Sequence, residues 1–224
     1  MEENVREVVI PGEKLDIESC KPGKGVLVEG DEAYASCLGV KHERADYMNV
    51  IPLTGKYMPH RDDKIIGKII DVGPTTWTVD INAHVTPNLH VNEVPWKVDF
   101  GDCNRFMKVG DVIFVKVSYV NEVKQVWLNM KDRGLHKLNG GYLMDITPTK
   151  VPRVIGKEGS MIKLIKEYTG CRIYVGQNGI IWIDGELDGI LLSIKTIKRI
   201  EEYAHIKGLT DKIKEFLESE KKGD

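Results

Sequence analysis

The amino-acid sequence predicts a multidomain fold that is mainly β at its start and α+β toward its end. Residues 5–58 hold short apolar runs separated by Pro-Gly, Gly-Lys-Gly and Glu-Gly-Asp turns. Residues 63–132 hold runs of strand length in which apolar and polar residues alternate. Residues 142–206 mix such alternation with apolar residues at helical spacing. A chain of 224 residues can hold two or three small domains, each with its own core.

The first segment, residues 1–60, is expected to form a small β domain. Its short β runs lie in VREVVIPGEKL, GKGVLVEGDEAYASCLGV and NVIPLTGKYMP, and the glycines and prolines between them mark turns. The polar sequence KHERAD, residues 41–46, is expected to be a solvent-facing loop. This segment shows no combination of residues typical of a catalytic site.

The second segment, residues 61–136, is expected to form five short strands that close into a small barrel. Strands are expected over residues 64–72, 77–83, 112–120 and 124–130, with a less regular stretch over residues 85–99. Trp77 falls on the same face of its strand as Val79 and Ile81. Alternation therefore favours a place in the core for Trp77 over a role in stacking bases.

The third segment, residues 137–207, is expected to fold in the order β-α-α-β-β-α. Strands are expected over residues 142–146, 171–175 and 180–184, and helices over residues 151–155, 160–168 and 187–206. Pro152 suits the first turn of its helix, where a missing N–H costs little. The sequence Gly-Gln-Asn-Gly, residues 176–179, is expected to be a hairpin turn in preference to an RNA contact. Residues 208–224 are expected to form a charged terminal helix that frays.

The most informative motif is VPRVIGKEGSM, residues 151–161, which places a G-x-x-G loop between two helices. Such a loop lets the helices approach closely and leaves backbone N–H groups at a helix start, where they can clamp the sugar-phosphate backbone of a nucleic-acid strand. The glycines would admit the backbone, the basic side chains would supply charge, and N–H groups around the helix start would meet a phosphate. The residues predicted to contact RNA are Arg153, Gly156, Lys157, Glu158, Gly159, Ser160 and Lys163. The alternative is a small α+β domain whose glycines only serve tight turns.

The charge distribution supports a local binding patch on a neutral body. The formal net charge is −2, whereas free-standing nucleic-acid binders are usually basic. Residues 150–172 nevertheless contain six basic and two acidic side chains. Such a patch suits a subunit that gains affinity from an assembly.

Two of these segments resemble known domain families. The β-α-α-β-β-α order, with G-x-x-G between its first two helices, resembles the type I KH domain. The phrases IIGKIIDVG, VGDVIFVKV and VWLNMKD resemble an S1 domain, an OB-fold barrel that binds RNA. S1 domains often carry stacking aromatic residues on their second and third strands, where this sequence has Thr75 and Thr78. Lys68, Lys116 and His84 remain as candidate contacts to the RNA backbone.

The chain up to about residue 207 resembles the S1/KH cap subunit of the archaeal RNA exosome. The resemblance rests on VVIPGE, then KYMPH and IIGKI before the S1-like segment, then GKEGSMI and GQNG. It implies a non-catalytic, cytoplasmic subunit without a cofactor, which docks mainly through its N-terminal domain. Three copies would sit on a hexameric ring of phosphorolytic exoribonuclease subunits and recruit single-stranded RNA for 3′-to-5′ degradation.

Two other classes of function remain open. One is a free-standing S1/KH protein, such as an RNA chaperone or translation factor, which the negative net charge disfavours. The other is a nuclease, which would need clustered carboxylates for magnesium or a phosphate site beside a general acid. Asp62 and Asp63 are the only adjacent aspartates, and the sequence shows no partner for them. The histidines and cysteines lack metal-ligand spacing, and neither a signal peptide nor a membrane span is expected.

Overall fold

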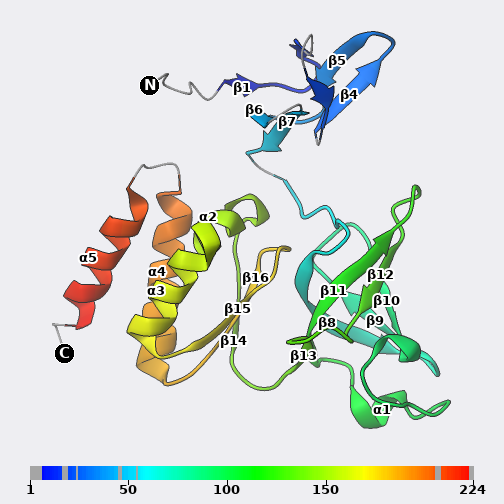
Figure 1. The fold of residues 1–224 in the computed structure, drawn as a ribbon. Coiled ribbons are helices and arrows are strands. Elements are labelled where there is room, and N and C mark those ends of the chain that lie inside the picture. Colours follow the sequence, from blue (N-terminus) through cyan, green and yellow to red (C-terminus); the bar gives the residue numbers. More distant parts are fainter. Residues whose placement is uncertain are drawn as a thin grey trace. The chain divides into compact units, whose positions relative to one another are not determined.

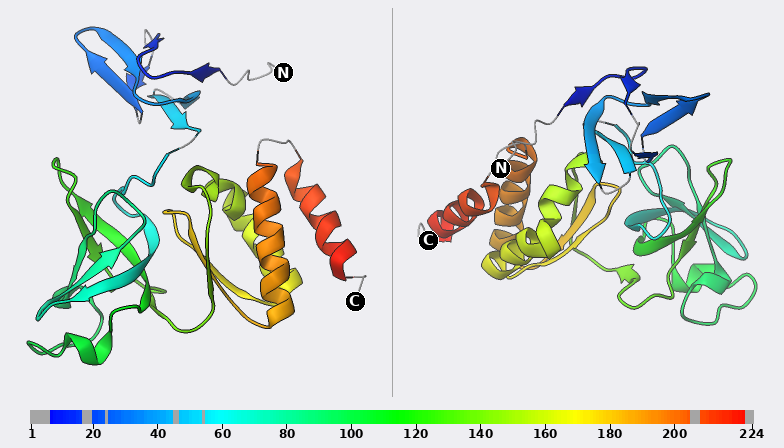
Figure 2. Two further views of the ribbon diagram at one scale, coloured as in Figure 1. Left: turned by 180° about the vertical axis from the view of Figure 1, so that it is seen from behind. Right: turned by 45° about the horizontal axis from the view of Figure 1, so that its top comes forward.

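The computed structural model describes residues 7–16, 20–23, 25–44, 47–53, 55–204 and 208–221. The chain folds as two compact units, Met1–Gly55 and Lys56–Asp224. The second unit contains a β barrel followed by a three-stranded sheet that helices cover on one face (Figures 1 and 2). Among the described residues, no helix has the length and apolar character needed to cross a membrane.

The first unit is built from two small sheets. Its strands are β1 (Val8–Val9), β2 (Lys14–Leu15), β3 (Lys21–Pro22), β4 (Val26–Glu29), β5 (Glu32–Ala35), β6 (Gly39–Arg44) and β7 (Tyr47–Pro52). They form a sheet in the order β1-β6-β7-β3 and a second sheet in the order β2-β5-β4. Inward-facing residues of both sheets make its core, which consists of Val9, Leu15, Ala33, Ala35, Met48 and Val50.

The polar sequence expected as a loop is a strand over residues 41–44, while residues 45 and 46 lie outside the described part. Lys41 is paired with Val50 and Glu43 with Met48 along the β6–β7 ladder. The prediction was wrong because β7 offers β6 a complete hydrogen-bonding partner and supplies the buried apolar side chains that β6 lacks. Polarity alone therefore did not identify a loop here.

The barrel has strands in each of the four predicted ranges, and a further short strand in the less regular stretch between the second and third of them. Its elements are β8 (Lys64–Val72), β9 (Thr76–Asp80), β10 (Asn88–His90), a 3-10 turn η1 (Val91–Glu93), α1 (Cys103–Phe106), β11 (Val112–Val120), β12 (Val126–Asn129) and β13 (His136–Leu138). The sheet order is β12-β10-β9-β8-β11-β13, and an additional β11–β12 pairing closes the barrel. The closure includes a parallel rung between Asn88 and Trp127.

The barrel interior confirms the prediction for Trp77. Its side chain is completely buried, and its indole N–H donates a hydrogen bond to the backbone oxygen of Met107 at 3.2 Å. Gly67, on β8, faces this interior, and a Cβ added there would lie 2.4 Å from Cγ1 of Val79. The strand therefore needs glycine at this point so that β8 and β9 can curve closely around the core.

The third segment confirms the predicted order of elements. It consists of β14 (Tyr142–Asp145), η2 (Pro148–Lys150), α2 (Val151–Ile155), η3 (Lys157–Gly159), α3 (Ser160–Thr169), β15 (Arg172–Val175), β16 (Ile180–Asp184), α4 (Leu187–Glu202) and α5 (Leu209–Lys221). The strands pair antiparallel in the order β14-β16-β15. Helices α2, α3 and α4 lie over one face of this sheet (Figure 1). This is the type I KH arrangement.

The predicted C-terminal helix is present as α5, but it is packed on the KH segment where a fraying helix was expected; residues 222–224 lie outside the described part. Leu209, Ile213 and Leu217 recur every four residues, are buried, and join the core formed with α3 and α4. The hydroxyl of Tyr168 donates a hydrogen bond to Glu218 at 3.1 Å on the polar side of the helix. The prediction was wrong because a few apolar residues in a charged sequence fall on a single helical face.

The hairpin turn between β15 and β16 attaches the KH sheet to the barrel. Asn178 is completely buried, and its side-chain nitrogen donates to the backbone oxygens of Ile66 at 2.7 Å and Ile81 at 2.8 Å. Its side-chain oxygen accepts from the N–H of Ile66 at 3.3 Å. The turn is a hairpin turn, as predicted, but its role in joining two structural parts was not predicted.

Candidate nucleic-acid interface

Gly156 forms the sharp bend between α2 and the G-x-x-G loop. Its backbone has φ 74° and ψ 174°, and its N–H donates to the backbone oxygen of Pro152 at 2.9 Å. A Cβ at this position would lie 2.7 Å from both the Cβ and the backbone nitrogen of Met161. Met161 is buried in the KH core. Glycine is therefore required here both for the backbone conformation and for the close approach of α2 to α3.

The outer half of the loop is open to solvent. Gly159 is left-handed at φ 76°, yet the nearest heavy atoms to an added Cβ would be in Ile162 and Lys163, at 3.9 and 4.0 Å. Glu158 is exposed and also has positive φ, 54°, which is uncommon for a residue with a side chain. The loop thus presents its backbone outward on the side that faces away from Met161.

Three of the predicted basic residues surround this open backbone. Arg153 lies on α2, Lys157 in the loop and Lys163 on the first turn of α3, and all three are exposed. Among the described residues, no carboxylate forms a salt bridge with any of them. Their charges are therefore available to an incoming anion.

The backbone N–H of Ser160 is already used within the protein. It donates to the backbone oxygen of Lys157 where the loop joins α3. Any phosphate held at this helix start would need other donors of the loop or of the first helical turn. The Ser160 side chain remains exposed beside them.

Two other basic residues of the patch, Arg172 and Lys166, already have partners within the protein. Arg172 is paired with Asp184 across the β15–β16 hairpin. The ammonium group of Lys166 lies 5.8 Å from the centre of the Tyr174 ring, and burial lowers the pKa of this lysine. The accessible positive charge of the patch therefore comes from Arg153, Lys157 and Lys163, together with the partly exposed Lys150.

The two barrel lysines predicted to contact RNA also differ in whether a carboxylate compensates their charge. Lys68 is exposed on β8. The Lys116 ammonium lies 2.9 Å from carboxylate oxygens of both Asp62 and Asp132, and hydrogen bonds to these two groups raise its pKa. The Lys116 charge is therefore already compensated within the barrel, whereas that of Lys68 is free of any such pair among the described residues.

The adjacent aspartates, for which the sequence showed no partner, have structural partners in the fold. Asp62 pairs with Lys116, and Asp63 accepts hydrogen bonds from the Tyr57 hydroxyl at 2.7 Å and the N–H of His60 at 3.0 Å. These contacts hold in place the backbone that leads into β8. Across the described part of the chain, no three His, Cys, Asp or Glu side chains gather as a metal site would require.

Sequence reasoning missed an exposed aromatic pair on the barrel. Tyr119 and Trp127 face each other across the β11–β12 hairpin, with ring centres 5.4 Å apart and planes inclined by 41°. Both are about half exposed, Tyr119 by 53% and Trp127 by 43%. Trp127 alternates with the buried Val126 and Leu128, and this alternation was the available signal. Tyr119 gave no such signal, because it is in phase with the buried Val115 and Val117 and follows a register shift after Val117.

The chain is similar to proteins of one family over nearly its whole length. A family model described as "KH domain" matches residues 141–188. The exosome complex component Rrp4 of Picrophilus torridus is 47% identical over 220 residues, covering 98% of this chain and 96% of that protein. The protein of the same description from Methanothermus fervidus is 42% identical and covers 95% of both chains. A crystal structure of a protein provisionally described as an exosome complex RNA-binding protein has a TM-score of 0.68, 35% identity, and covers 75% of this chain and 98% of that one.

Proposed function

The chain belongs to the Rrp4 family of exosome complex components, and from this membership we propose that it is a non-catalytic RNA-binding subunit of an exosome. The observation that carries the proposal is the 47% identity with an Rrp4 protein over 98% of the chain. The G-x-x-G loop with its unpaired cations is a second support, because it offers a single strand both open backbone and positive charge.

In the proposed mode of binding, the strand crosses the outer side of the G-x-x-G loop. The absence of side-chain atoms at Gly159 admits the sugar-phosphate backbone, and Arg153, Lys157 and Lys163 neutralise phosphates. Gly156 shapes the loop from within and does not itself touch the strand. Glu158 projects a carboxylate beside the same path and weakens the contact.

The same proposal assigns a role to each segment of the chain. Residues 1–60 dock on the nuclease subunits, residues 61–136 form the S1 domain, residues 137–207 form the KH domain, and residues 208–224 extend it. Three copies cap a hexameric ring of phosphorolytic exoribonuclease subunits in the cytoplasm and deliver single-stranded RNA for 3′-to-5′ degradation. The exposed apolar side chains of the first unit support docking there, and they include Val8, Ile10, Leu27, Val28 and Ile51.

The test is a reconstitution with the nuclease subunits of the same organism. The purified chain should leave RNA intact in the presence of magnesium and phosphate. When added to the nuclease subunits, it should enter one complex with them, at three copies by mass, and accelerate degradation of long single strands. RNA degradation by the chain alone, or its failure to join the nuclease subunits, would contradict the proposal.

A further inference from the structure

The connection between the barrel and the KH sheet contains an Asn-Gly pair. Residues 139–141 join β13 to β14, and both Asn139 and Gly140 are exposed. Asparagine followed by glycine is chemically labile in water, because glycine has no Cβ to shield its backbone nitrogen from the amide carbon of the preceding side chain. The connection therefore holds a group that can react without an enzyme.

Both reacting groups of this pair are free of hydrogen bonds in the fold. Within the described part of the chain, no donor or acceptor engages the Asn139 side chain or the Gly140 N–H. Gly140 is held instead through its carbonyl, which accepts from the indole N–H of Trp182 at 2.8 Å. Gly140 has φ 66°, and a Cβ added there would meet no atom within 4 Å, so the space beside its backbone is open. The pair can therefore react without breaking a hydrogen bond of either reacting group.

The chain contains a second Asn-Gly pair, Asn178 and Gly179, in the opposite environment. Asn178 is completely buried, and its amide makes three hydrogen bonds to backbone groups of Ile66 and Ile81. The N–H of Gly179 donates to the backbone oxygen of Gly176 at 3.1 Å. Both reacting groups are engaged here, so this pair can react only when the turn opens.

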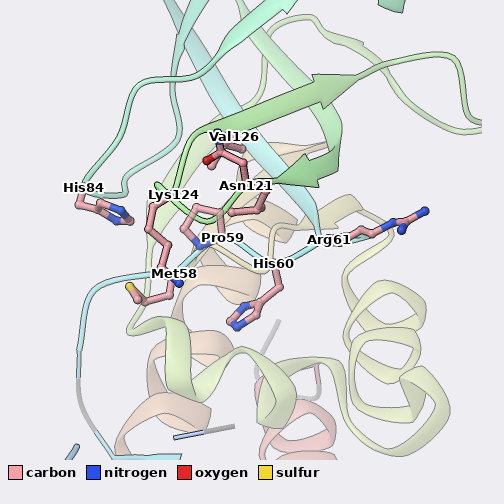
Figure 3. A pocket seen from close by; sticks show the side chains of 9 residues that line it. Met58, Pro59, His60, Arg61, His84, Asn121, Lys124 and Val126 are labelled. Atoms are coloured by element: carbon pink, nitrogen blue, oxygen red, sulfur yellow. The ribbon is translucent and has the colours of Figure 1, made fainter. Parts of the chain in front are cut away.

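Other accessible asparagines lack the following glycine. Asn82 is exposed, but Ala83 follows it. Asn121, which lines the barrel pocket shown in Figure 3, precedes Glu122, and its amide makes two hydrogen bonds to Gln125. Among the asparagines of the described part, exposure, a free amide and a following glycine occur together at position 139 alone.

We propose that Asn139 is a site of spontaneous deamidation, which converts it to aspartate or isoaspartate in the connection between the barrel and the KH sheet. The deprotonated backbone nitrogen of Gly140 attacks Cγ of Asn139, and the new C–N bond closes a cyclic imide. The Cγ–Nδ2 bond breaks, and ammonia leaves with the proton that Gly140 lost. Water then opens the imide at either carbonyl carbon. Addition at Cγ gives aspartate, whereas addition at the backbone carbonyl carbon gives isoaspartate, in which the main chain continues through the former side chain.

The two products differ in their effect on the fold. Aspartate leaves the backbone unchanged and adds a negative charge at an exposed position. Isoaspartate adds a carbon atom to the backbone path between β13 and β14. The next residue, Gly141, already lies so close to Trp182 that an added Cβ would be 2.6 Å from the indole nitrogen. A longer path at this point therefore displaces the Gly140 carbonyl from the Trp182 N–H, and only isoaspartate disturbs the junction.

The test follows the full chain during incubation in neutral and in mildly alkaline buffer, at a temperature at which it stays folded. Cleavage after lysine and arginine places Asn139 in peptide 138–150 and Asn178 in peptide 173–195, so mass spectrometry follows the two pairs separately. Peptide 138–150 should accumulate a form heavier by the difference between water and ammonia, and faster at the higher pH, because the attacking nitrogen must be deprotonated. Peptide 173–195 should change at least about tenfold more slowly, since its pair reacts only from rare open states.

Two controls locate the reaction. In guanidinium chloride both peptides should react at similar rates, because the fold no longer protects Asn178. Asn139→Gln keeps the amide on a longer side chain, which would have to close a larger ring, and it should leave peptide 138–150 unmodified.

Melting curves test the effect on the fold. Isoaspartate is detected with a carboxyl methyltransferase that labels this residue specifically. Fractions of the incubated chain that carry the label should melt at a lower temperature than the parent. Asn139→Asp reproduces the other product and should melt like the parent.

The outcomes decide the proposal without reference to RNA. Faster modification of peptide 138–150 than of peptide 173–195, with the difference lost on unfolding, supports it. If peptide 138–150 reacts no faster in the folded chain, or reacts only after unfolding, the fold protects Asn139 and the proposal is wrong. Labelled fractions that melt like Asn139→Asp would overturn the effect assigned to isoaspartate. None of these results depends on RNA binding, so the proposed function stands or falls separately.

Discussion

At the residue scale, the two central positions of the G-x-x-G loop carry opposite charges on one exposed backbone. Lys157 attracts a phosphate and Glu158 repels it, and neither forms a salt bridge with a described residue. Glu158 has a positive φ, which strains glutamate and lysine alike because both carry a Cβ. Replacing Glu158 by lysine therefore changes the charge of the loop and leaves the backbone strain the same. The loop therefore allows a test of charge that is separate from folding.

We expect Glu158→Lys to tighten RNA binding and to steepen its salt dependence. One added contact on a single strand should change the slope of log affinity against log salt by about 0.7. Glu167→Lys makes the same charge change on α3, away from the loop, and serves as the control. Titrations at several salt concentrations measure both. Identical slopes for the two variants would show that the loop does not contact phosphate.

The two loop glycines should respond differently to alanine. Gly156→Ala should lower the free energy of unfolding by roughly 1–3 kcal/mol more than Gly159→Ala does, because its Cβ meets Met161 while both share the strain of positive φ. Chemical denaturation of the two variants measures the difference. Equal losses would mean that α2 and α3 can separate without cost, contrary to the close approach described above.

The residue pattern of the loop could be predicted from the sequence because glycine spacing is a local signal. The compensation of Lys116 could not, since Asp62 and Asp132 reach it from separate parts of the barrel. Lys116 adds to the number of basic residues in the sequence, but in the fold two carboxylates neutralise its charge. Pairing of this kind depends on tertiary structure, so a count of basic residues overestimates the charge available to RNA.

At the element scale, the β15–β16 turn is a structural link as well as a connection. Three backbone groups of the barrel, on Ile66 and Ile81, depend on the Asn178 amide for their hydrogen bonds to this turn. Tyr174 of β15 adds ring contacts to Phe114 of β11 at 5.2 Å and His136 of β13 at 5.3 Å. The KH sheet and the barrel therefore share one continuous packed region.

We expect Asn178→Ala to destabilise this junction by about 2–4 kcal/mol, because it leaves buried polar groups unsatisfied. Gln177→Ala is the control, because the Gln177 contact to the barrel uses its backbone N–H, which donates to Lys64 at 2.9 Å. Hydrogen exchange should show faster opening of β8 and of the β15–β16 hairpin in Asn178→Ala alone. Unchanged protection in that variant would show that the aromatic contacts suffice to hold the junction.

Element order was predictable from the sequence, whereas the roles of several elements were not. The alternation of Trp77, Val79 and Ile81 with polar residues and the helical spacing over residues 160–168 each indicate which side of one element is apolar, and the structure confirms both. The polar strand β6, the packed helix α5 and the buried Asn178 acquire their roles from distant partners. Local patterns carry no information about such partners, and for this reason these features were missed or predicted wrongly.

At the scale of the whole molecule, the cations without a carboxylate partner among the described residues lie in separate places. They surround the G-x-x-G loop and, on the barrel, include Lys68 and Lys124, while the chain as a whole has a net charge of −2. A strand bound to one copy thus gains few phosphate contacts. Several copies held together would raise the effective concentration of each further site once the first is occupied.

We therefore expect the isolated chain to bind short single-stranded RNA weakly and the assembled cap to bind long strands at least about a hundredfold more tightly, which is the lower range for linked sites. The gain should depend on length, because a strand too short to reach a second copy can use only one set of contacts. Titrations of short and long oligonucleotides against the chain alone, the nuclease subunits alone and the complex separate these contributions. The control is a complex built with Lys157→Glu, which should retain the nuclease subunits but lose most of the gain, since each copy loses a phosphate contact at its loop. If the complex with parent chain binds long RNA no better than the nuclease subunits alone, the cap contributes no affinity and RNA is held by the ring.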